Sequence, residues 1–153
     1  MPSVGANPYL RTKILTASPR ELRLMLYDGA IKFCRLARDA IEGKQYESSY
    51  NSLMRAQKIV LELSTSLNHT ADPQLCSRLS ALYTYIYRLL VDANMDRDGK
   101  KVDEAIGLLQ YERETWSLLM GKLGEGEGGD VDPAGQQVVG AQQTAMSSLS
   151  TNA

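Results

Sequence analysis

Residues 16–30 read TASPRELRLMLYDGA, a complete helix start followed by apolar residues on two sides of the helix. Ser18 is a preferred N-cap residue, Pro19 suits the first helical position, and Glu21 can complete a capping box. At helical spacing one apolar face holds Leu22, Met25, Leu26, Gly29, Phe33, Ala37 and Ala40, and a second stripe nearly opposite holds Leu24, Tyr27, Ile31 and Cys34. Either the chain itself buries this helix all round, with residues 9–15 as one source of cover, or the second stripe binds a partner.

Three further stretches repeat the helical periodicity. The first helix is predicted to end at Gly43, and others are expected at about 46–67, from Asp72-Pro73 to Asp96, and at about 102–123. The expected inward positions of the second helix are Tyr50, Leu53, Ile59, Val60, Leu63 and Leu67. Because the connections are short, consecutive helices should pack antiparallel. The sequence therefore predicts an all-α, up-down four-helix bundle.

The two ends of the chain differ from this body. Residues 1–17 form an apolar N-terminal segment, residues 18–123 the bundle domain, and residues 124–153 a glycine-rich, acidic tail that we expect to be disordered. Within the tail, Val138, Val139, Met146 and Leu149 hint at a weak amphipathic element, although a simple linker is the favoured interpretation.

Composition restricts the classes of function. The net charge is -1, which argues against a dedicated nucleic-acid-binding protein. The N-terminal residues contain no apolar signal-peptide region, and no run approaches the ~18 apolar residues of a membrane span, so we expect a cytoplasmic protein without membrane insertion. Cys34 and Cys76 lie in apolar helical patterns and are expected to be buried thiols rather than a disulfide or a metal pair.

Catalysis is not indicated. His69 is the single histidine, so neither a di-iron bundle nor a zinc cluster can be built, and no metal or other cofactor is predicted. A histidine phosphotransfer bundle is the main alternative, but His69 lies in a loop pattern before Pro73 rather than in mid-helix. A plain structural oligomer, paired through Leu24, Tyr27 and Ile31, is a third interpretation. Binding remains the favoured class of function.

Several longer motifs resemble one known family. They are Tyr9 and Ile14 followed by TASPRELRLMLYDGAI at 16–31, then AIEGKQYESSYNSLMRAQKIVLELSTSLN at 40–68, ALYTYIYRLLVDAN at 81–94 and ERETW at 112–116. Together they closely resemble the flagellar secretion chaperones of the FliS family over about residues 7–120. The resemblance implies an antiparallel helical bundle in the cytoplasm that binds the disordered C-terminal segment of flagellin, one to one. Such a protein would prevent premature polymerisation of flagellin and keep it competent for flagellar type III secretion.

The resemblance also implies roles for particular residues. In that family the N-terminal segment can occupy part of the binding groove when flagellin is absent, and the export apparatus is a second candidate partner. The resemblance and the second apolar stripe together give the candidate partner-binding residues: Tyr9, Leu10, Ile14, Leu24, Tyr27, Ile31 and Tyr83. Structural roles are expected for Ser18, Pro19, Glu21 and Asn94, and Asp28 is expected to fix a neighbouring backbone or side chain.

Overall fold

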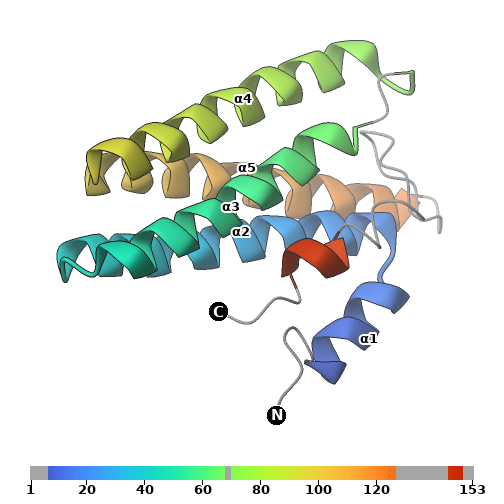
Figure 1. The fold of residues 1–153 in the computed structure, drawn as a ribbon. Helices are drawn as coiled ribbons and strands as arrows, with labels where there is room; N and C mark the ends of the chain where they lie inside the picture. Colours follow the sequence, from blue (N-terminus) through green and yellow to red (C-terminus); the bar gives the residue numbers. More distant parts are fainter. Residues whose placement is uncertain (1–6, 68–69, 127–144, 150–153) are drawn as a thin grey trace.

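The computed structural model describes residues 7–67, 70–126 and 145–149, and within these ranges every regular element is a helix. The long helices are α1 (Pro8–Thr16), α2 (Pro19–Glu42), α3 (Tyr46–Thr65), α4 (Pro73–Asp96) and α5 (Gly99–Gly126). A short helix at 145–149 follows (Figure 1). The predicted all-α class is confirmed.

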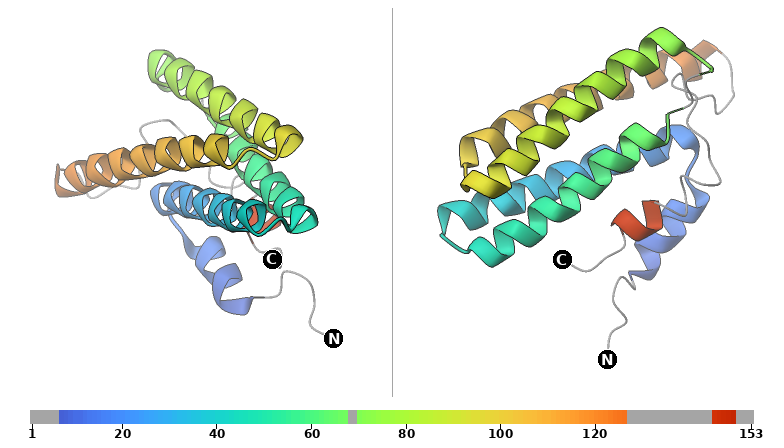
Figure 2. Two further views of the ribbon diagram at one scale, coloured as in Figure 1. Left: turned by 90° about the vertical axis from the view of Figure 1, so that its left-hand side faces the viewer. Right: turned by 45° about the horizontal axis from the view of Figure 1, so that its top comes forward.

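Helices α2 to α5 form a closed ring of neighbours. Helix α2 packs against α3 and α5, α3 also packs against α4, and α4 packs against α5. Consecutive helices run in opposite directions, and α1 lies outside the ring beside the N-terminal half of α2 (Figures 1 and 2). This is the antiparallel up-down bundle that the short connections predict.

Local capping explains where the helices begin. Ser18 is the N-cap of α2, and its Oγ accepts a hydrogen bond from the Glu21 N–H at 3.2 Å. Asp72 caps α4 in the same way, with Oδ1 accepting from the Leu75 N–H at 3.1 Å. Helix α5 begins at Gly99, three residues before the predicted Val102. The cause is Asp98, whose Oδ1 accepts from the Lys100 N–H at 2.9 Å and so fixes the first turn.

Helix α2 is buried on both of its apolar sides. Leu22, Leu26 and Phe33 on the first face are buried. On the second stripe Tyr27, Ile31 and Cys34 are buried, and so is the adjacent Arg23. The chain therefore covers most of the second stripe itself. Within the described residues both cysteines are buried thiols that form no disulfide, and burial raises the pKa of the Cys34 thiol to about 12.

One predicted core position is wrong. Tyr50 is 53% exposed, because the inward line of α3 runs through Ser49, which is 3% exposed. The Ser49 hydroxyl is satisfied within the first turn, since its Oγ donates to the Tyr46 carbonyl at 3.0 Å. The inward line then continues through Leu53, Ala56, Val60 and Leu63, all of which are buried.

The ends contain more helix than the sequence predicts. The N-terminal segment holds α1, whose cap is Asn7, with Oδ1 accepting from the Leu10 N–H at 3.1 Å. In the C-terminal tail, residues 127–144 and 150–153 lie outside the described residues, so the predicted disorder there is not addressed. Residues 145–149 form a helix in which Ala145 is fully buried. None of the helices in the described ranges is both long and apolar enough to cross a membrane.

Candidate partner-binding surfaces

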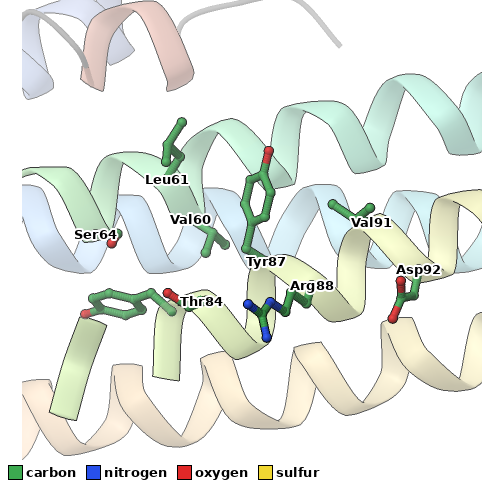
Figure 3. Close-up of a pocket in the computed structure, with 9 residues that line it drawn as sticks. Val60, Leu61, Ser64, Thr84, Tyr87, Arg88, Val91 and Asp92 are labelled. Atoms are coloured by element: carbon green, nitrogen blue, oxygen red, sulfur yellow. The ribbon is translucent and has the colours of Figure 1, made fainter. Parts of the chain in front are cut away.

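An apolar groove runs between α3 and α4. Its volume is about 380 Å³, and its lining residues are Val60, Leu61 and Ser64 from α3 and Tyr83, Thr84, Tyr87, Arg88, Val91 and Asp92 from α4. Figure 3 shows the Tyr87 ring reaching from α4 across to α3, with Arg88 and Asp92 on the α4 side. Leu61 is 50% exposed, so the groove presents apolar surface to solvent. Such a surface is suited to the apolar face of a helix.

A buried polar cluster lies beneath this groove and joins α2, α4 and α5. The hydroxyl oxygens of Tyr27 and Tyr83 lie 2.5 Å apart, and the Arg23 Nη1 donates to the Tyr83 hydroxyl at 3.0 Å. The Arg23 guanidinium also lies over the Trp116 ring, 4.7 Å from its centroid. Burial raises the pKa of both tyrosines, so their hydroxyls stay protonated and act as hydrogen-bonding groups.

Ion pairs tie α5 to α2 at the edges of the bundle. Arg113, in the ERETW motif, donates from Nε to the Asp28 carboxylate at 2.5 Å. Arg38 pairs with Asp103 through an Nε–Oδ1 distance of 3.0 Å. Asp28 therefore fixes a side chain of the neighbouring helix.

A second, smaller hollow of about 200 Å³ lies where α1 meets α2. Its lining comes from both ends of the chain as well as from α2: Leu10, Lys13, Met25, Asp28, Gly29, Lys32, Phe33 and Leu149. Leu10 and Leu149 thus lie near the same part of α2 although they are far apart in sequence.

The structure does not place the candidate partner-binding residues on one exposed surface. Tyr9 is 76% exposed and Leu10 and Leu24 are half-buried, whereas the other four are buried: Ile14, Tyr27, Ile31 and Tyr83. Tyr27 and Tyr83 contact each other. Because Tyr27 and Ile31 are only 0% and 5% exposed, the alternative of an oligomer paired through this stripe gains no support. The predicted partner-binding roles stay predictions.

The remaining candidates are placed as follows. Ser18, Pro19 and Glu21 form the first turn of α2, and Asn94 is half-buried in the last turn of α4. His69 lies outside the described residues, and no group of three or more potential metal ligands occurs among the residues that were described. Sequence reasoning missed Tyr87 and Val91 as groove residues. The signal was the continuation of the apolar pattern past Tyr83 on the outer side of α4.

The chain is thus an antiparallel helical bundle with an open apolar groove between α3 and α4. The protein family described as "Flagellar protein FliS" matches residues 3–123. The chain is 40% identical over 113 residues to the flagellar secretion chaperone FliS of Bacillus subtilis (strain 168), covering 72% of this chain and 84% of that relative. It is 30% identical to FliS of Campylobacter jejuni, covering 74% and 89%, and 30% identical to FliS of Salmonella typhimurium, covering 76% and 87%.

The chain belongs to the FliS family of flagellar secretion chaperones. The resemblance found in its motifs is thereby confirmed, and membership supports a role in flagellar export. This is a family of chaperones and not of enzymes. The family match ends at residue 123, so the tail that begins at Gly124 lies beyond it.

Proposed function

We propose that this protein is a cytoplasmic chaperone for flagellin, which it binds one to one through the disordered C-terminal segment of that protein. Binding would order the segment as helices in apolar grooves and hide it from other flagellin molecules until type III secretion. The observation that carries the proposal is the open apolar groove between α3 and α4 in a member of this family. A disordered ligand loses conformational entropy when it binds, so a long apolar contact is needed to offset that cost.

The accessible residues are the proposed direct contacts. Leu61 and Tyr87 would contact the ligand in the α3–α4 groove, and Tyr9, Leu10 and Leu24 would extend the contact over α1 and α2. The buried Tyr27 and Tyr83 would form the floor of the groove and would not contact the ligand directly. Ile14 and Ile31 would contact the ligand only after movement of a covering element. Helix α1 is the mobile candidate, because it lies outside the ring of packed helices.

Calorimetric titration with the C-terminal segment of a flagellin from the same cell tests the proposal. We expect saturable one-to-one binding, a negative heat-capacity change and new helicity in the segment. Leu61→Asp should weaken binding by about tenfold or more, since it places a charge in an apolar contact. Leu118→Asp is the matched control, because Leu118 is 66% exposed on α5. It lines neither the α3–α4 groove nor the hollow between α1 and α2.

Two results would count against this function. One is the absence of binding heat and of new helicity at several temperatures. The other is an equal loss of affinity in the Leu61 and Leu118 variants while both remain folded, which would remove the α3–α4 groove from the site.

A further inference from the structure

The 145–149 helix rests on a glycine in the middle of α2. A Cβ atom built on Gly29 would lie 2.3 Å from the Cδ2 of Leu149 and 3.3 Å from the Cδ1 of Ile59. The first distance is shorter than the contact distance of two carbon atoms that are not bonded, so a side chain at residue 29 would force the Leu149 side chain to move. Glycine destabilises a helix interior relative to alanine, and here it permits a close contact with the end of the chain.

The rest of the short helix is matched to the same surface. Ala145 is fully buried, and Met146 and Leu149 pack against the hydrophobic core. Positions 145 and 149 are four residues apart, and 146 and 149 three apart, so all three lie on one side of the helix. The surface next to Leu149, called here the Gly29 surface, consists of Met25, Gly29, Phe33 and Ile59, and Leu10 of α1 lines the same hollow. In Figures 1 and 2 the 145–149 helix lies beside α1 and over the α2–α3 pair.

We propose that residues 145–149 are an intramolecular ligand that covers the Gly29 surface, and that a helical partner using this surface must displace them. The occupant is this chain's own C-terminal segment, which lies beyond the part of the chain matched by the family. The cover stands independently of the proposed function, whereas competition with flagellin rests on it.

The size of the contact makes the cover removable. A helix of five residues is far too short to be stable alone, so it forms only while it is packed. Because the segment belongs to the same chain, its binding is intramolecular, and even a weak contact can stay closed. A longer partner helix buries more apolar area on the same surface and therefore outcompetes it.

Methyl NMR of the full chain labelled at methionine tests the cover directly. The Met146 methyl resonance should have a shifted, core-like position in the wild type and move to the random-coil position in Leu149→Asp. In Gly29→Ala it should move in the same direction, because the added Cβ forces the Leu149 side chain out of its place. Gly107→Ala is the matched control, because a Cβ on that α5 glycine would meet nothing within 4 Å. Both alanine variants gain helix propensity, but only the one at residue 29 should shift the Met146 resonance, and Met120 should report an unchanged bundle in all variants.

The outcomes of this first experiment decide whether the cover exists. A random-coil Met146 signal in the wild type would overturn the proposal. An unchanged Met146 signal in both Gly29→Ala and Leu149→Asp would overturn it as well, since the contact with Gly29 would then not hold the segment.

Competition is tested by titrating the flagellin segment into the wild type and into Leu149→Asp. Removal of the cover should raise the affinity by about threefold to thirtyfold, because the ligand no longer competes with a tethered segment. Equal affinities with Met146 released would overturn the displacement. If no variant binds flagellin at all, the proposed function fails, while the Met146 resonances still decide whether the cover exists.

Discussion

Arg23 of α2 donates a hydrogen bond of 3.0 Å to the Tyr83 hydroxyl of α4, and neither side chain reaches solvent. A fully buried guanidinium is costly unless hydrogen bonds and an aromatic face replace its hydration. Tyr83 supplies an acceptor, and the Trp116 ring of α5 lies 4.7 Å from the guanidinium carbon. This cluster therefore holds three helices in one relative arrangement beneath the α3–α4 groove.

The two tyrosine hydroxyls should contribute unequally to stability. Tyr83→Phe removes an acceptor of buried Arg23 as well as the partner of Tyr27, so we expect a loss of about 2–3 kcal/mol in the free energy of unfolding. Tyr27→Phe removes one neutral hydrogen bond, and the expected loss is about 0.5–1.5 kcal/mol. Urea unfolding followed by circular dichroism measures both values. An equal or larger loss for Tyr27→Phe would mean that the Arg23–Tyr83 bond is not the principal interaction of the cluster.

Local sequence signals predict the bundle well. The Ser18-Pro19 and Asp72-Pro73 pairs mark the starts of α2 and α4 because capping depends only on neighbouring residues. Periodicity then identifies most of the core. It fails at Tyr50, where the true inward position is a small polar residue, Ser49, that a hydrophobic pattern does not detect.

The surfaces could not be predicted in the same way. Periodicity shows that α2 is apolar on two sides, but which of them the chain covers depends on where α4 and α5 pack. Arginine is usually exposed to solvent, and only the tertiary contacts with Tyr83 and Trp116 explain the burial of Arg23. Leu149 lies against Gly29, although the two residues are 120 positions apart in the sequence. A local sequence pattern cannot predict such a contact.

Glu62 on α3 should make stability depend on pH. It is 6% exposed, and burial raises its pKa from 4.5 to about 7. Between these values the folded state holds a proton that the unfolded state has released, so stability falls as pH rises through this window. Glu62→Gln removes the ionisation and should therefore stabilise the protein at about pH 8 relative to its effect at about pH 5, by roughly 1–3 kcal/mol.

The control for this titration is Glu47→Gln, which removes one negative charge from an exposed position of the same helix. Urea unfolding of wild type and both variants at the two pH values gives the comparison. A stability difference between Glu62→Gln and the wild type that is the same at both pH values would show that burial does not perturb this carboxyl group.

The Arg113–Asp28 pair should contribute little to stability despite its short distance. The side chains are 35% and 55% exposed, so water and salt screen their attraction. Arg113→Gln should cost less than about 1 kcal/mol, and about 0.5 M NaCl should abolish most of that loss. A double-mutant cycle with Asp28→Asn isolates the pair. A coupling energy above about 2 kcal/mol would instead indicate that the pair is held in a buried, rigid geometry.

Flagellin binding should depend only modestly on salt if the α3–α4 groove is the site. Its lining is mainly apolar and aromatic, and the two charged side chains, Arg88 and Asp92, have opposite signs. Raising NaCl from about 0.1 M to about 0.5 M screens exposed charges but leaves apolar burial intact, so the affinity should fall by less than about threefold. Titration calorimetry at the two salt concentrations measures this directly. A loss of several tenfold would mean that ion pairs supply most of the affinity, and the ligand would then have to lie over the charged outer faces of the helices rather than in the groove.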